Sequence, residues 1–189
     1  GADSDGYAIA GTVSGTVATL GSVAEFADAT TCYPIGAVMM DTDKVMIAYQ
    51  NGIISQSAIM ATLTGTSIAY GTKVDANTTT DSVSYTTLTQ LCKHSTTLAT
   101  LVYRVSATVT ECVTLSLSGT TITVNTAGKA AFGGSVDIRY PSICDLTSSS
   151  FALTYTDVTD TNKGNAQMGT ISGTTITAGA NKYTFDSGS

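Results

Sequence analysis

Few residues in this sequence have the types and spacing that catalysis requires. His94 is the only histidine, Glu25 and Glu111 are the only glutamates, and no Gly-x-Ser-x-Gly stretch marks a nucleophilic serine. His94 follows Lys93 in a polar segment that we interpret as a turn, which favours a solvated histidine over a general base. Most aspartates also lie in expected turns, where their carboxylates accept hydrogen bonds from the backbone. The sequence therefore predicts no catalytic residues and no enzyme activity.

Two acidic loops could hold a hard cation through oxygen ligands. The first contains Asp3 and Asp5, and over a few residues it resembles the calcium loop of FG-GAP propeller repeats. The second places Asp157, Asp160 and Asn162 ahead of a glycine. Neither pattern recurs at the equivalent loops elsewhere in the chain, so calcium is not a requirement of the fold. We predict no cofactor and ordinary turn chemistry at both loops, with calcium as the alternative.

Three tyrosines, Tyr49, Tyr103 and Tyr155, recur at matching positions 54 and 52 residues apart. Rings in register could form a repeated platform on which sugars stack, as in propeller lectins. The same periodicity suits buried rings whose hydroxyl groups reach polar partners. A binding platform would keep a polar companion beside each ring, whereas the residues that follow these tyrosines do not match one another. We favour the structural interpretation and keep sugar stacking as the alternative.

The cysteine count favours an oxidising compartment. The four cysteines include no Cys-x-x-Cys pair, and with a single histidine they disfavour zinc. An even number in an acidic, Thr-rich chain predicts two disulfide bonds, with three pairings possible, and buried free thiols are the alternative. The cysteines concerned are Cys32, Cys92, Cys112 and Cys144.

A glycosylation sequon stands at Asn77-Thr78-Thr79 in a polar stretch of the chain. It predicts an N-linked glycan on Asn77 if the source organism modifies proteins in this way. A plain solvated loop is the alternative, and it is the interpretation that we favour for the run of threonines.

The composition excludes several partners. The net charge is −6 with only 8 Lys and Arg residues, which is too few to neutralise the phosphates of a nucleic acid. The longest apolar runs, such as residues 35–40, are far shorter than the ~20 residues that cross a bilayer. We expect no membrane insertion and no leader at the start of the chain, and we place the protein outside the cell or on a cell or virion surface. The abundance of threonine favours strands over helices.

The strongest signal is internal repetition. Four stretches share one pattern of alternating residues around a Gly-Thr pair, and their central glycines are 50, 54 and 54 residues apart. Glycine reaches positive φ at little cost, so each stretch predicts a tight β-hairpin. The central glycines are Gly15, Gly65, Gly119 and Gly173.

A second set of strands repeats in register with the hairpins. Residues 44–49, 98–103 and 150–155 are apolar on both faces, which is typical of a sheet covered on both sides. Each follows another apolar segment, at residues 35–40, 83–91 and 136–143. The unit is therefore a four-stranded antiparallel sheet of about 52 residues. We predict an all-β fold of β-propeller-like blades, with tandem β-sandwiches or other repeated sheets as alternatives.

Divided in this way, the chain contains an incomplete unit at its start. Residues 1–21 form a half unit that is only a hairpin, and residues 180–189 form an extension that resembles the approach to another first strand. Three and a half blades do not close a ring, so either the array continues beyond this chain or another copy completes it. The three full repeats are expected at residues 22–71, 72–125 and 126–179.

The pattern resembles the repeats of extracellular propeller-type and surface-array proteins of microbes and viruses. This resemblance implies a fold more than a function. We expect a non-catalytic structural or interaction protein that assembles with copies of itself, as the subunit of a surface fibre, filament or layer. A carbohydrate-binding lectin with one shallow site per blade is the alternative, and glycans are then the partner.

Overall fold

The computed structural model describes residues 5–28, 32–52, 55–77, 89–106, 108–134 and 136–186. Apart from the short 3₁₀ helix η1 (Thr126–Gly128), every regular element in these ranges is a β-strand. The all-β prediction is therefore confirmed. Among the described residues, no helix is long and apolar enough to cross a membrane.

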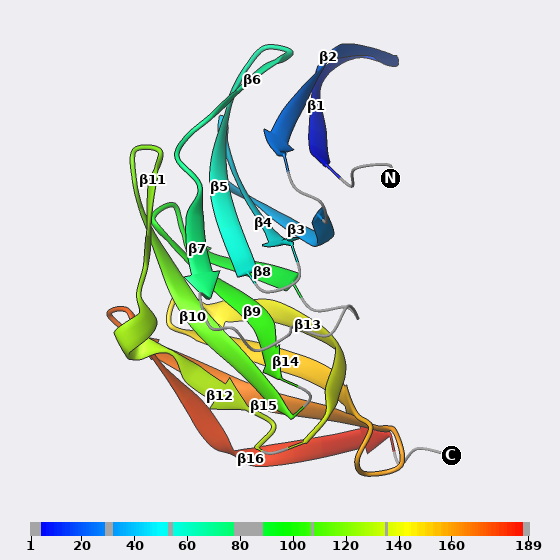
Figure 1. Cartoon of the computed structure of the whole chain (residues 1–189), viewed down its shortest axis with the longest axis vertical. Helices are drawn as coiled ribbons and strands as arrows, with labels where there is room; N and C mark the ends of the chain where they lie inside the picture. Colours follow the sequence, from blue (N-terminus) through cyan, green and yellow to red (C-terminus); the bar gives the residue numbers. More distant parts are fainter. Residues whose placement is uncertain are drawn as a thin grey trace.

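The strands form one hairpin and three larger antiparallel sheets, which follow one another along the molecule in chain order (Figure 1). The N-terminal hairpin consists of β1 (Gly6–Ser14) and β2 (Val17–Ala27). Sheet I consists of β3 (Cys32–Asp41), β4 (Lys44–Asn51), β5 (Ser55–Thr64), β6 (Ser67–Tyr70) and β7 (Val74–Asn77). Sheet II consists of β8 (Thr89–Ser95), β9 (Leu98–Ser106), β10 (Val109–Ser118), β11 (Thr121–Val124) and β12 (Ala130–Phe132). Sheet III consists of β13 (Ile138–Thr147), β14 (Ser150–Asp157), β15 (Lys163–Ser172) and β16 (Thr175–Asp186).

Each larger sheet is a simple meander in which consecutive strands are neighbours. In sheet I the outer position beside β5 is shared by two short strands, β6 at one end and β7 at the other. Strands β11 and β12 share the position beside β10 in the same way, with η1 between them. In sheet III the long strand β16 occupies this position alone.

The four predicted hairpins are confirmed. The central glycines Gly15, Gly65, Gly119 and Gly173 have φ angles of 61°, 59°, 63° and 61°. Each is the first residue of a two-residue Gly-Thr turn, and the threonine is not among the residues with positive φ, a combination typical of a type II′ turn. The residues paired across the four turns are Ser14 with Val17, Thr64 with Ser67, Ser118 with Thr121, and Ser172 with Thr175.

The hydrophobic core consists of three layers, one between each pair of successive sheets. The layer between the hairpin and sheet I contains Phe26, Cys32, Ile47, Tyr49 and Ile59. The layer between sheets I and II contains Met46, Met60, Leu101, Tyr103 and Leu115, among others. The layer between sheets II and III contains Val102, Cys112, Phe132, Phe151 and Leu153, among others. Sheets I and II are covered on both faces, so their central strands are apolar on both sides, as the sequence indicated.

Two local predictions are wrong. His94 lies inside β8 and is buried, because the turn to β9 is made by Thr96 and Thr97. Residues 182–186 do not approach a new strand, because they continue β16 and pair with β15, as in the pair Lys182 and Gln167. Of the predicted strand at residues 83–91, only 89–91 lie within the described ranges, and they belong to β8.

Candidate functional site

The three repeated tyrosines are structural. The exposed fractions of Tyr49, Tyr103 and Tyr155 are 1%, 1% and 3%, so no ring offers a face to a sugar in solvent, and this corrects the sugar-stacking alternative. The Tyr103 hydroxyl donates a hydrogen bond to Glu111 Oε2 at 3.0 Å, and the Tyr49 ring packs edge-on against Phe26 with centroids 5.2 Å apart. Burial raises the pKa of Tyr49 and of Tyr155 to about 12, and also raises that of Tyr103.

The acidic loop after β14 is a turn stabilised by its own side chains. Asp157 is buried, and its Oδ1 accepts hydrogen bonds from the backbone N–H of Thr159 at 3.1 Å, from the Thr159 hydroxyl at 2.6 Å and from the Asp160 N–H at 3.2 Å. Lys182 Nζ stands 2.9 Å from Asp157 Oδ2, and Lys163 Nζ stands 2.9 Å from Asp160 Oδ1. Because a lysine already neutralises each carboxylate, this arrangement supports the turn interpretation of Asp157, Asp160 and Asn162.

This turn predicts a specific loss of stability in acid. Burial acts to raise the pKa of Asp157, but hydrogen bonds from Thr159 and Lys182 outweigh it and hold the pKa below the ordinary 3.8. A carboxyl with a lowered folded-state pKa stabilises the fold above its unfolded pKa, and the contribution is lost as the pH falls through the folded-state value. We expect Asp157→Asn to lower the free energy of unfolding at pH 7 by about 1–3 kcal/mol.

Urea titrations at pH 7 and at pH 3 or below measure both effects. The difference between wild type and Asp157→Asn is expected to shrink as the pH falls below the unfolded pKa and through the lower folded-state pKa, because protonation of Asp157 removes the charge that its partners stabilise. Asp160→Asn is the control, since Asp160 is exposed and its removal costs less than about 1 kcal/mol. A gap between wild type and Asp157→Asn that stays constant with pH would contradict the role assigned to this carboxylate.

Three carboxylates meet at the open end of the hairpin. Asp5, Glu25 and Asp28 each place an oxygen within 4.8 Å of the others, and Asp5 Oδ2 accepts a hydrogen bond from the Tyr7 hydroxyl at 3.1 Å. Glu25 and Asp28 were not identified from the sequence, because they join Asp5 only through the pairing of β1 with β2. Asp3, the other candidate in this loop, lies outside the described residues. Exposed acidic groups commonly gather without a metal, so this cluster alone does not assign one.

His94 has a structural environment. Its Nε2 is 2.8 Å from Thr100 Oγ1, and its ring packs against Phe151 with centroids 5.9 Å apart. Burial lowers the pKa of His94, which favours the neutral imidazole. A shallow cavity of about 380 Å³ lies beside it, between β3, β8 and β13, and is lined in part by Cys92, Cys144 and Asp145. Within the described residues, this cavity brings together no group of three ligands close enough to hold a metal.

All four cysteines are free in the structure, so the two predicted disulfide bonds are not present. Cys32 lies in the layer between the hairpin and sheet I, whereas Cys112 lies in the layer between sheets II and III. Burial raises the pKa of Cys32 to about 11 and that of Cys92 to about 12, and it also raises the pKa of Cys112. Cys144 is the exposed thiol of the set. The geometry therefore fits the alternative of free thiols.

The predicted glycan site is poorly placed for a modification of the folded chain. Asn77 is the last residue of β7, and only 7% of it is exposed. Thr78 and Thr79, which complete the sequon, lie outside the described residues. Glycosylation of Asn77 stays a prediction that the burial of this side chain does not favour.

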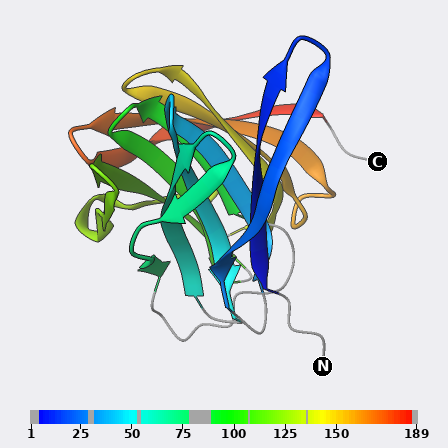
Figure 2. The same cartoon turned by 90° about the horizontal axis from the view of Figure 1, so that it is seen from above.

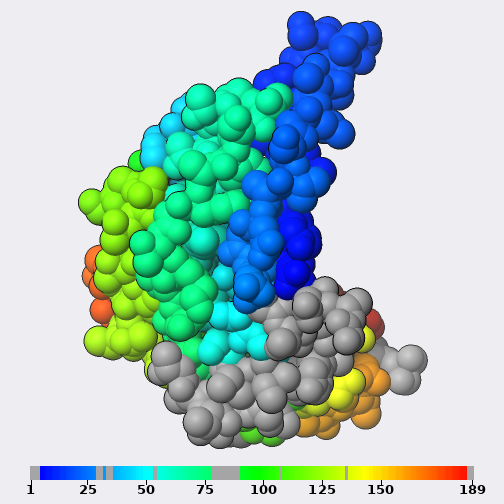
Figure 3. Space-filling view, turned by 45° about the horizontal axis from the view of Figure 1, so that its top comes forward, coloured from blue at the N-terminus to red at the C-terminus, as the bar shows by residue number. Residues whose placement is uncertain are grey.

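The most unusual surface of the molecule is at its two ends. The tip of the N-terminal hairpin projects beyond the sheets (Figure 2; Figure 3), and the hairpin exposes Tyr7, Ile9, Val13, Val17, Leu20 and Val23. At the other end of the array, sheet III exposes Met168, Tyr183 and Phe185. Apolar side chains that gather at a protein surface often mark an interface. Sequence reasoning did not single out these side chains, because on both ends they follow the same pattern as the buried strands.

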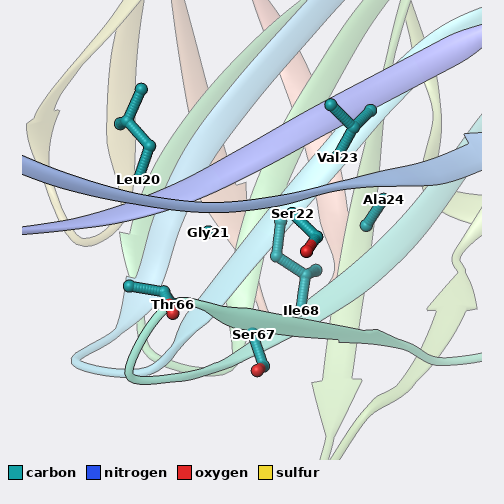
Figure 4. Close-up of a pocket in the computed structure, with 8 residues that line it drawn as sticks. All are labelled: Leu20, Gly21, Ser22, Val23, Ala24, Thr66, Ser67 and Ile68. Atoms are coloured by element: carbon teal, nitrogen blue, oxygen red, sulfur yellow. The ribbon is translucent and has the colours of Figure 1, made fainter.

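A groove of about 620 Å³ separates the hairpin from sheet I. Residues 20–24 of β2 form one wall, and Thr66, Ser67 and Ile68, from the β5–β6 turn and β6, form the other (Figure 4). It is mainly polar, and none of its lining side chains is titratable, so these side chains supply neither a general acid nor a general base. Among the residues that line the groove, Gly21 lies directly against the backbone of Thr66. The hairpin therefore contacts sheet I closely at this point, although its tip stands free.

Comparisons of the chain with known protein families, with characterised proteins and with solved structures find no match.

Proposed function

We propose that this chain is a non-catalytic structural protein that assembles with copies of itself, as the subunit of a fibre, filament or layer outside the cell or on a cell or virion surface. A single observation carries the proposal: Ile9 and Met168, at the two ends of the sheet array, are exposed, whereas the matching apolar side chains inside the array are buried. The burial of the three repeated tyrosines supports this proposal over the alternative of a lectin.

The proposal includes a repeated, propeller-like blade as the building unit. The strand registers support it, because the third residue of the second strand pairs with a matching residue of the third strand in every larger sheet. In each pair, the residue of the third strand stands five positions before the glycine of its Gly-Thr turn. In sheets I and II the pair lies on the face turned toward the next sheet in the chain. These pairs are Met46 with Met60 in sheet I, Thr100 with Thr114 in sheet II, and Ala152 with Met168 in sheet III.

The outer face of sheet III exposes a position that is buried in sheets I and II. Met46 and Met60 are 0% exposed because sheet II covers them, and the equivalent side chains of sheet II are also fully buried. Met168, at the position of Met60, is 39% exposed. Tyr183 lies beside it on the same face, since its cross-strand partner Ala166 is two residues from Met168 in β15. Sheet III therefore presents one half of an inter-sheet layer to solvent.

The N-terminal hairpin presents the other half. Ile9, Ile59 and Val113 each stand six residues before the glycine of their turn. Ile59 and Val113 are 5% and 0% exposed because the preceding sheet or hairpin covers them, whereas Ile9 is 51% exposed. Val23, which pairs with Ile9 across the hairpin, is 60% exposed. Covering these side chains removes apolar area from water, which stabilises an assembly by about 25 cal/mol for each Å² that becomes buried.

Sedimentation velocity over a range of protein concentrations, together with negative-stain electron microscopy, tests the proposal. We expect the average mass to rise with concentration well above that of one 19.2 kDa chain, and elongated particles or sheets to be visible. A chain that stays monomeric at every concentration up to the millimolar range would contradict the proposal. Specific retention of a monomeric chain on a glycan array would instead favour the lectin.

A further inference from the structure

A close contact between a glycine and the next hairpin turn occurs at all three junctions inside the chain. Gly21 of β2 lies against the carbonyl group of Thr66, in the turn between β5 and β6. Gly71, after β6, lies against Thr120 in the turn of sheet II, and a Cβ atom built on Gly71 would stand 2.8 Å from the Thr120 carbonyl oxygen. Side chains larger than hydrogen do not fit at such a distance, so glycine permits this approach.

The third junction keeps the contact although its local sequence differs. Asn125 stands where sheet I has Gly71, and its side chain donates hydrogen bonds to Thr114 O at 3.1 Å and Ser116 Oγ at 2.8 Å. The short helix η1 follows and brings Gly128 to the turn of sheet III, where a Cβ atom would stand 2.6 Å from the Thr174 carbonyl oxygen. Gly128, three positions after Asn125, thus makes the contact that Gly71 makes in sheet I. This indicates that the junction between two sheets depends on a close contact between a glycine and the next turn.

At each end of the array, one of the two groups that make this glycine-to-turn contact is present without the other. Gly179 of β16 matches Gly71, because the glycine lies beside the carbonyl of Met168 in one sheet and of Met60 in the other. Unlike Gly71, it has no turn of a following sheet within 4 Å among its nearest atoms. Thr16, in the turn of the N-terminal hairpin, matches Thr66 and Thr120 and is exposed.

From these two groups we infer that copies join head to tail: the turn of one copy's N-terminal hairpin, at Thr16, seats on Gly179 of another copy. The outer face of that hairpin then covers the outer face of sheet III, so that Ile9 and Met168 enter one new apolar layer. This inference rests on the proposed self-assembly and specifies its polarity. The contact is heterologous, because it joins two different surfaces of the same chain, and repetition of it gives an open filament or a ring.

Two single substitutions test the polarity because each disables one end only. Ile9→Lys places a charge on the hairpin face, and Met168→Lys places one on the sheet III face; both side chains are exposed in the single chain, so folding is expected to be unaffected. Burying an unpaired ammonium group in the new layer is costly, and we expect either variant to raise the dissociation constant of assembly about 100-fold or more. Met39→Lys is the matched control, since Met39 is 50% exposed on β3 of sheet I.

The decisive measurement is sedimentation velocity of an equimolar mixture of the two variants. Each variant alone is expected to be monomeric, and the mixture is expected to form a dimer and nothing larger, because the intact hairpin of Met168→Lys can seat on the intact sheet III of Ile9→Lys. A mixture that stays monomeric, or assembly that Ile9→Lys abolishes and Met168→Lys does not affect, overturns the head-to-tail contact. In either case, the proposed function still holds if the wild-type chain assembles. If the wild-type chain is monomeric, both the proposed function and the head-to-tail contact are overturned.

Gly179→Val tests the seat itself and is expected to behave as Met168→Lys does in the mixture with Ile9→Lys. Its Cβ would stand 2.9 Å from the Met168 carbonyl oxygen within the same chain, so thermal unfolding must show that the variant is folded. If a folded Gly179→Val assembles as well as wild type, the glycine seat is overturned, whatever the lysine variants show.

Discussion

Phe151→Ala is expected to lower the free energy of unfolding by about 3–5 kcal/mol, the range for a fully buried aromatic side chain cut back to a methyl group. Phe151 is 0% exposed in the layer between sheets II and III. Its ring packs against Phe132 and His94, with centroids 5.6 and 5.9 Å away. Across the strand pair it covers Gly169, which has no side chain with which to fill the space that alanine would leave.

Urea unfolding followed by circular dichroism measures this loss. Leu146→Ala is the control, because Leu146 lies on the neighbouring strand β13 but is 50% exposed, and its replacement is expected to change stability by less than about 0.5 kcal/mol. The free energy of unfolding of Phe151→Leu should lie between those of Phe151→Ala and wild type, because leucine retains part of the buried volume. A loss below about 1 kcal/mol for Phe151→Ala would show that sheets II and III do not share a packed layer.

The second large effect is expected at a buried ion pair that joins sheet II to the entry of sheet III. Arg104 is 4% exposed; its guanidinium Nη2 is 2.9 Å from Asp137 Oδ1, and its Nε donates a hydrogen bond to the Ser106 carbonyl at 2.8 Å. Asp137 also lies 3.2 Å from Arg139. Asp137→Ala leaves the guanidinium buried without its carboxylate, and we expect a loss of about 3–5 kcal/mol.

The opposite replacement, Arg104→Met, is expected to cost less. Methionine retains apolar volume in the layer, and the Asp137 carboxylate, which is 19% exposed, keeps Arg139 as a partner. Lys163→Ala is the control for an exposed pair and should change stability by about 1 kcal/mol at most. Equal losses for Asp137→Ala and Lys163→Ala in urea titrations would contradict the assigned burial of the Arg104 charge.

The hairpins and the strands were predictable from local sequence alone. A Gly-Thr pair at Gly15, Gly65, Gly119 and Gly173 needs only the local preference of glycine for positive φ, and the structure has each of them in a two-residue turn. The apolar character of both faces around Ile47 and Leu101 was likewise readable, because residues of a strand alternate between its two faces. These features depend on neighbours in the chain, so a single sequence contains the information.

Long-range contacts were not predictable in the same way. His94 looked like a turn residue because polar residues surround it, yet the register of β8 with β9 brings it beside Thr100 and into the core. The carboxylates of Asp5 and Glu25 were separate features until the hairpin paired them. The glycine contacts had a visible signal, since Gly21, Gly71 and Gly179 end matching stretches of sequence. What Gly21 and Gly71 contact was not visible, because their partners Thr66 and Thr120 lie about 45–50 residues further along the chain.

By itself, the sequence determined that this chain forms strands, where its tight turns lie, and which strands have two apolar faces. Periodicity and turn chemistry are local properties, and a local energy difference between backbone conformations is sufficient to express them. Only the tertiary structure decided which of those apolar faces are covered. Ile9 and Ile59, or Met168 and Met60, are alike in the sequence, and they differ because burial depends on whether another sheet lies against them.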